Sequence, residues 1–127
     1  MQFTVTQPLL GFEKITQITL EKIDEIFMRI ESPDSKEITF TLVNPFALRE
    51  YSFDIPSAIQ EKLEIDEKSN VLIYNIVIIQ SPIENSVVNF IAPIVFNTTS
   101  KKAGQIIISD DPSLSIAEPI STFLKAK

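Results

Sequence analysis

Hydrophobic and polar residues alternate with a period of two along much of this chain. In residues 25–31, and again in residues 37–43, apolar side chains recur at every second position, so each segment has a hydrophobic face. Four turn-forming residues, 32–35 (SPDS), separate the two segments. Such alternation is typical of half-buried β-strands, and a short polar turn commonly joins neighbouring strands. The pattern therefore predicts an antiparallel hairpin over residues 25–43.

Three further segments carry strand patterns of differing strength. Residues 71–80 are apolar on both faces except at Asn75, and many of their side chains are β-branched. This combination predicts a central strand that is covered on both sides. Residues 3–6 and 15–20 carry weaker strand patterns near the start of the chain.

A second hairpin is expected in the C-terminal half. Residues 85–91 and 94–98 continue the strand pattern, and Pro93 between them predicts a bend, a bulge or a sheet edge, because proline lacks a backbone N–H. The polar turn that follows ends at Gly104, which we expect to be its left-handed residue. Residues 105–109 then complete the hairpin and bury their isoleucines.

One segment has helical periodicity instead. Asp54 is a candidate N-cap, and Pro56 suits the first turn of a helix. Apolar residues follow at i, i+4 spacing, namely Ile55, Ile59 and Leu63. Seven or so strands at short spacing with one such helix predict a mainly β fold. We expect a small, antiparallel, barrel-like single domain that spans residues 1–127 and contains one short α-helix.

The amino-acid composition excludes several kinds of catalytic, metal-binding and nucleotide-binding site. The 127 residues include no cysteine and no histidine, which excludes disulfides, thiolate metal sites and imidazole ligands or bases. The two glycines, Gly11 and Gly104, are too few for a phosphate-binding or dinucleotide-binding glycine motif. The sequence therefore indicates a protein that is not an enzyme, with no metal and no cofactor.

Charge and hydropathy indicate the partners. A net charge of −6 disfavours direct nucleic-acid binding and attracts basic proteins. The alternative is that the charge only keeps the protein soluble. The N-terminus lacks the basic start and apolar run of a signal peptide. Residues 71–79 form the longest apolar stretch, which is too short to span a bilayer. We expect a soluble, cytoplasmic protein with no membrane partner.

Two groups of residues leave alternatives open. A carboxylate-dependent hydrolase could draw its acids from a small set: Asp54, Glu84, Asp110 and Asp111. Adjacent acids on an extended chain point to opposite sides, so a turn or cap role is favoured for them. Three loop phenylalanines could serve as binding anchors or as satellite core contacts: Phe12, Phe46 and Phe53.

An ordered set of short motifs goes further than composition. They are LGFE at 10–13, VNPF at 43–46, NFIAPIVFNT at 89–98 and GQII at 104–107, with SDD at 109–111 closing the series. From about residue 3 to residue 120 the chain resembles the FliW family of flagellar assembly factors. No single motif is specific, but their order is, above all APIVFNT after an apolar strand.

The resemblance implies a regulator that switches between protein partners. Members of this family bind flagellin in the cytoplasm, and they antagonise CsrA, a small basic dimer that represses translation of flagellin mRNA. Accumulated flagellin occupies such a protein and frees CsrA to repress, whereas export of flagellin reverses this. A flagellin-dedicated chaperone without a repressor-binding role is the alternative that the sequence leaves open.

The resemblance also nominates partner-binding residues. They lie in the loop after the first hairpin and in the second signature: Asn44, Pro45, Phe46, Pro93 and Asn97. For each of them a structural role, such as turn-setting or a satisfied buried amide, is the favoured interpretation. Residues 115–120 depart from the family pattern, because Ala117 and Glu118 replace the basic or histidine residues of relatives. Residues 121–127 lie beyond the resemblance, and we expect a flexible tail there.

Overall fold

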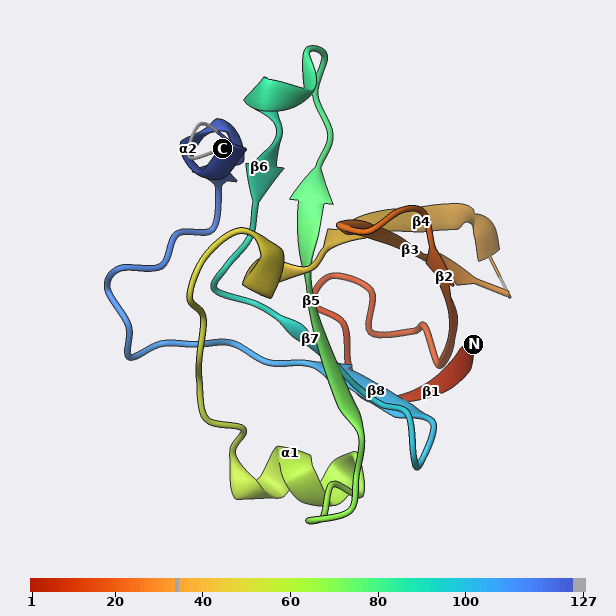
Figure 1. The fold of residues 1–127 in the computed structure, drawn as a ribbon. Coiled ribbons are helices and arrows are strands. Elements are labelled where there is room, and N and C mark those ends of the chain that lie inside the picture. The colour runs from red at the N-terminus through yellow and green to blue at the C-terminus, as the bar shows by residue number, and fades with distance from the viewer. Residues whose placement is uncertain (34, 125–127) are drawn as a thin grey trace.

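The computed structural model describes residues 1–33 and 35–124. Figure 1 shows the strands wrapped into a barrel, with the two α-helices outside it. The strands are β1 Gln2–Gln7, β2 Gln17–Lys22, β3 Phe27–Ser32, β4 Ser35–Val43, β5 Val71–Ile78, β6 Val87–Val88, β7 Ile94–Asn97, β8 Lys102–Gln105 and β9 Glu118–Pro119. The helices are η1 Pro45–Ala47, α1 Ser57–Lys62, η2 Ile83–Asn85 and α2 Ser121–Leu124.

The sheet closes on itself. Its strand order is β4-β3-β2-β1-β8-β7-β5, and a further pairing between β4 and β5 closes these seven strands into a barrel. β6 and β9 extend the sheet beyond β5. The pairings are antiparallel apart from β1 with β8, which run parallel. The predicted mainly β, barrel-like fold is confirmed, and the parallel pair is a detail that the alternation of residues did not indicate.

The two strands of the first predicted hairpin are β3 and β4. They pair antiparallel from Phe27 opposite Val43 to Glu31 opposite Thr39, with an irregularity before Ser32. Asp34, which belongs to the predicted turn, lies outside the described residues. The weaker patterns near the N-terminus correspond to β1 and β2, which also pair with each other.

β5 carries side chains into two cores, as its two apolar faces predicted. Leu72, Tyr74 and Ile76 pack into the barrel interior around the ring pair Phe3–Phe96, whose centroids lie 5.2 Å apart. The intervening residues of β5 point outward. There they meet a second apolar layer beneath the loops and α1, built around Val43, Tyr51, Leu63, Phe90, Val95 and Ile106.

The predicted helical stripe is present, but the predicted cap is not. Leu63 is fully buried against Val95, with Ile59 packed beside it. The N-cap position of α1 is taken by Pro56, whose ring makes no side-chain cap, and Asp54 lies outside the helix. α1 therefore depends on its apolar contacts rather than on a polar cap.

The second hairpin is displaced from its predicted position. Its strands are β7 and β8, and the left-handed turn residue is Lys101, with a φ of 61°, not Gly104. Gly104 lies inside β8, where a Cβ atom would stand 2.3 Å from the Gln7 Cβ. It is a glycine because β1 approaches too closely for a side chain. Ile106 and Ile108 are buried as expected, although they follow β8 rather than extend it.

The first part of the predicted flexible tail is helical. Residues 121–124 form α2, a second short α-helix that the sequence pattern did not predict. The ring of Phe123 packs edge-on against Phe90, with centroids 5.5 Å apart. Residues 125–127 of the predicted tail lie outside the described residues. Within the described chain, no helix has the length and apolar character needed to cross a membrane.

Candidate functional site

Residues 44–56 cross one face of the molecule and join two hollows. In Figure 1 this yellow segment leaves η1 beside β5 and descends to α1, crossing the blue segment that follows β8. The first hollow lies at its start and the second at its end. We call this surface the 44–56 face.

The first hollow lies between η1 and β5. Asn44 and Phe46 line it on one side and residues Val71–Tyr74 on the other, around a volume of about 240 Å³. The Asn44 Oδ1 accepts a hydrogen bond of 3.0 Å from the Phe46 backbone N–H, so Asn44 caps η1. Pro45 is buried, whereas the Phe46 side chain is 54% exposed. The NPF motif thus bends the chain and leaves its aromatic ring facing solvent.

An aromatic row connects the two hollows. The Phe46 ring centroid lies 6.2 Å from that of Tyr51, which lies 5.5 Å from that of Phe53. The buried Tyr51 hydroxyl donates a 2.6 Å hydrogen bond to the Phe90 carbonyl and accepts one of 3.1 Å from the Asn75 Nδ2. Burial raises the pKa of Tyr51 to about 12, so its hydroxyl stays protonated and holds the segment against β5.

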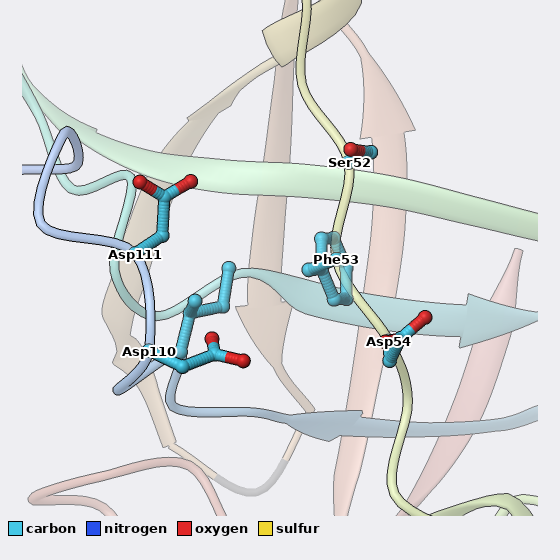
Figure 2. Close-up of a pocket in the computed structure, with 6 residues that line it drawn as sticks. Ser52, Phe53, Asp54, Asp110 and Asp111 are labelled. Atoms are coloured by element: carbon cyan, nitrogen blue, oxygen red, sulfur yellow. The ribbon is translucent and has the colours of Figure 1, made fainter.

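The second hollow is acidic and has an apolar floor. It encloses about 310 Å³ and is lined by Ser52, Phe53, Asp54, Ile108, Asp110 and Asp111. Figure 2 shows the 52–54 segment on one side and the two consecutive aspartates on the other. An adjoining hollow adds Pro56 and the side chain of Ile107, which is 55% exposed.

One aspartate of this hollow is fixed by its own turn. The Asp111 Oδ1 accepts hydrogen bonds from the Ser113 hydroxyl at 2.6 Å and from the Ser113 backbone N–H at 3.0 Å. These bonds hold the pKa of the Asp111 carboxyl below its ordinary value. Asp111 therefore presents a fixed negative charge at the rim of the hollow.

The structure brings three of the four acids of the hydrolase alternative to this hollow, namely Asp54, Asp110 and Asp111. Glu84 lies on η2 and does not line the hollow with the three aspartates. Over the described residues, no three acidic side chains are placed to hold a metal ion. The hollow combines carboxylates with exposed apolar surface, an arrangement that suits a lysine or arginine side chain of another protein.

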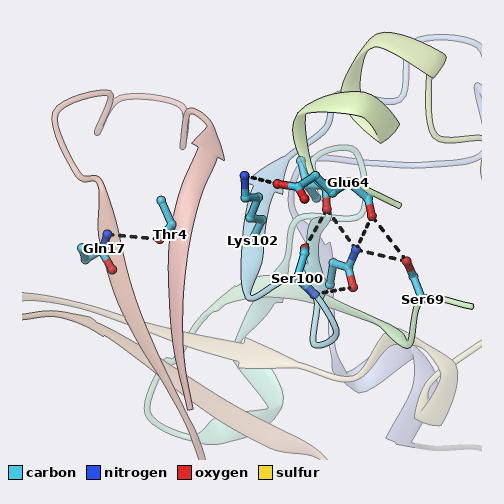
Figure 3. Close-up of polar contacts among 8 residues, drawn as sticks. Thr4, Gln17, Glu64, Ser69, Ser100 and Lys102 are labelled. Carbon is cyan, nitrogen blue, oxygen red and sulfur yellow. Dashed lines mark hydrogen bonds and ion pairs between the residues drawn. The ribbon is translucent and has the colours of Figure 1, made fainter. Parts of the chain in front are cut away.

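Asn97 lies in a different part of the fold and is fully buried. Its Nδ2 donates to the carbonyls of Leu63 and Glu64 at 2.9 and 3.1 Å and to the Ser69 Oγ at 3.3 Å. Its Oδ1 accepts from the backbone N–H groups of the β7–β8 turn, at residues 99 and 100. Figure 3 shows this network, with an ion pair between Lys102 and Glu64 beside it. Asn97 therefore ties the end of α1 to the β7–β8 turn.

The structure thus separates the five predicted residues into two groups. Asn44, Pro45 and Phe46 meet at the first hollow, and Phe46 is the exposed member. Pro93 is buried, and its carbonyl accepts a 3.0 Å hydrogen bond from the Ile106 N–H. The direct role of each in partner binding stays a prediction.

The sequence did not indicate that Asp54 and Phe53 would lie beside Asp110 and Asp111. The two pairs are separated by more than fifty positions, and the local pattern predicts a helix cap at Asp54. Two local features mark these loops: the loop phenylalanine Phe53 and the consecutive acids Asp110 and Asp111. Nothing in their local pattern indicates that the two loops meet.

Three comparisons identify relatives of the chain. The family model described as "FliW protein" matches residues 1–120. The flagellar assembly factor FliW of Sulfurimonas denitrificans is 58% identical over 125 residues, which cover 98% of this chain and 99% of that protein. FliW 2 of Wolinella succinogenes is 44% identical, with 99% and 94% coverage, and FliW of Helicobacter pylori strain G27 is 41% identical, with 98% and 95% coverage.

A solved structure supports the same fold. The crystal structure of a flagellar assembly factor FliW superposes with a TM-score of 0.87 and covers 94% of this chain and 84% of that chain. Its sequence identity is 23%, so this likeness bears on the fold alone.

Proposed function

This chain belongs to the FliW protein family, whose curated relatives are flagellar assembly factors, and on that premise we propose that it binds flagellin and antagonises the repressor CsrA. The proposal places the protein in the cytoplasm, where both partners are made. Flagellin that awaits export occupies the protein and leaves CsrA free to repress. Once flagellin is exported, the protein binds CsrA and translation of flagellin resumes.

The acidic hollow is the observation that carries the CsrA part of this proposal. Three aspartates line it over an apolar floor, on a protein whose net charge is −6. A basic protein is attracted by the overall field and gains specific contacts where cationic side chains meet fixed carboxylates. A negative protein docked on an RNA-binding dimer also disfavours the approach of phosphate groups, even without covering the RNA site.

Calorimetry with purified CsrA and purified flagellin tests the proposal. The first variant neutralises the hollow with Asp54→Asn, Asp110→Asn and Asp111→Asn. A matched control removes three exposed charges elsewhere with Glu13→Gln, Glu61→Gln and Glu84→Gln, so both variants have the same net charge. We expect the hollow variant to bind CsrA about tenfold more weakly than the control variant does, because exposed charges remote from the contact contribute little to affinity.

Each other outcome has a distinct meaning. Equal weakening by both variants assigns the attraction to net charge and removes the hollow from the proposal. Binding of flagellin without any binding of CsrA leaves a flagellin-dedicated chaperone. Failure to bind either protein overturns the proposed function.

A further inference from the structure

One edge of β5 is paired along only part of its length. Towards β7, residues Val71–Tyr74 are paired throughout. On the opposite edge, β4 pairs with Asn75–Val77 and then ends at Val43. The chain next turns away through η1, whose first residue, Pro45, has no N–H to donate. No strand covers the Val71–Tyr74 edge on this side within the part of the chain that the structure describes.

The backbone groups on this open edge can be assigned. The carbonyls of Asn70 and Ile76 accept hydrogen bonds of 2.9 and 3.0 Å from Thr98 and Asn89, on the side of β6 and β7. Because alternate residues of a strand direct their N–H and C=O groups to opposite edges, the even-numbered residues face β7. Val71 and Ile73 therefore direct their N–H and C=O groups to the open edge.

The open edge borders the first hollow. The four side chains of Val71–Tyr74 are each only half-buried, and the hollow beside them encloses about 240 Å³. The exposed ring of Phe46 forms its outer wall. A strand edge with unpaired backbone groups beside an aromatic-lined hollow is the arrangement that binds an extended peptide by strand addition.

Acidic residues outnumber lysines at both ends of this edge: Lys22 lies beside Asp24 and Glu25 at one end, and Lys68 beside Asp66 and Glu67 at the other. The Asn44 N–H donates a 2.9 Å hydrogen bond to the Ile26 carbonyl, which places the turn holding Asp24 and Glu25 next to the hollow. At the other end, exposed Asp66 and Glu67 precede β5. The aromatic row leads on to the acidic hollow. An apolar strand with basic residues at its ends matches this pattern of charge.

We infer that the open Val71–Tyr74 edge of β5 takes up an extended apolar segment with basic flanks from the basic protein partner, which pairs with it as an added strand. The inference rests on the proposed function, because CsrA is the basic partner there. The segment makes backbone hydrogen bonds to Val71 and Ile73 and places an apolar side chain against Phe46. Its basic flanks face the acids at the two ends of the edge.

Residue-resolved amide hydrogen exchange, measured by NMR on the labelled full chain with and without saturating CsrA, tests the pairing. The Val71 and Ile73 amides exchange fast in the free protein, and their exchange slows at least about tenfold in the complex, because they acquire acceptors. The Leu72 and Tyr74 amides, already bonded to β7, serve as internal controls and are protected in both states.

The results distinguish failure of the added-strand model from failure of the proposed function. If calorimetry shows that CsrA binds while Val71 and Ile73 keep their fast exchange, the added strand is wrong and the proposed function survives. If CsrA does not bind at all, the proposed function fails and the pairing with CsrA fails with it. Protection by flagellin alone, or protection that grows with protein concentration without a partner, assigns the edge to a different occupant and overturns the inference.

A side-chain substitution provides a second test. Phe46→Ala removes the exposed wall of the hollow without touching the sheet, and we expect it to weaken CsrA binding about tenfold. Ile83→Ala is the matched control, because Ile83 is 44% exposed on η2 and lines neither hollow. Equal affinities for the two variants would argue against the edge as the docking site.

Discussion

Local packing and hydrogen bonding explain the residue types at two buried positions, Asn97 and Gly104. Asn97 carries an amide into an apolar strand, which is costly unless the amide is fully bonded. Its donors and acceptor all find partners on the α1 exit and the β7–β8 turn. Position 97 therefore requires an amide for structural reasons, whichever partner the protein binds.

Asn97→Ala should lower the free energy of unfolding by about 3 kcal/mol, because it removes the amide that donates to the Leu63 and Glu64 carbonyls and accepts from the backbone N–H groups of residues 99 and 100. Chemical denaturation followed by circular dichroism measures this loss. Asn85→Ala, an exposed asparagine in η2, should change stability by less than about 0.5 kcal/mol. A loss below about 1 kcal/mol at Asn97 would contradict the assigned network.

Gly104→Ala should destabilise the protein by about 3 kcal/mol, since the new Cβ would collide with the Gln7 side chain and backbone of the neighbouring strand. Gly11→Ala is the comparison. Gly11 has open space around it but a φ of 83°, so its cost is backbone strain of about 1 kcal/mol. Thermal or urea unfolding ranks the two, and the reverse order would refute close approach as the reason for Gly104.

At the scale of elements, β5 and the 44–56 segment depend on each other. β5 lies between the barrel interior and the outer layer, and Tyr51 connects the segment to it through the Asn75 amide. The same contact positions both hollows of the 44–56 face. Loosening Tyr51 therefore affects stability and the shape of the 44–56 face together.

The stability of the protein should depend on Tyr51 at alkaline pH. Because burial raises the folded-state pKa of Tyr51 to about 12, above the ordinary value of 10.0, its contribution is complete below pH 10 and is lost as the pH rises towards 12. Unfolding midpoints measured across this range should fall more steeply for the native chain than for Tyr51→Phe. Parallel curves for the two proteins would contradict the buried, protonated hydroxyl.

The sequence predicts those elements whose pattern is local. Alternation identified β3 and β4, a run of apolar and β-branched residues identified β5, and i, i+4 spacing identified the stripe of α1 that ends at Leu63. It misplaced Gly104, because the constraint there comes from Gln7, a residue almost a hundred positions away. Local residues were enough to place Phe46 in a loop. They did not predict that Asp54 lies beside Asp110. Contacts between distant loops leave no periodic signal in either loop.

At the scale of the whole molecule, charge and edge geometry act together. In the proposed function, the net charge of −6 attracts a basic partner over distance, and the 44–56 face and the open β5 edge provide the contacts. Raising the ionic strength above about 0.15 M should weaken the antagonism of CsrA, because salt screens exposed charges over about 8 Å at that concentration. RNA-binding assays of CsrA across a salt series measure this, and a salt-independent antagonism would count against the electrostatic part of the proposal.

We propose that this one protein switches between two partners, and a displacement experiment measures that switch. A preformed complex of this protein with CsrA is titrated with flagellin, and free CsrA is measured by its recovered binding to flagellin mRNA. We expect flagellin to release CsrA in proportion to the flagellin bound and to restore RNA binding. A stable complex of all three proteins, with CsrA still unable to bind RNA, would contradict it.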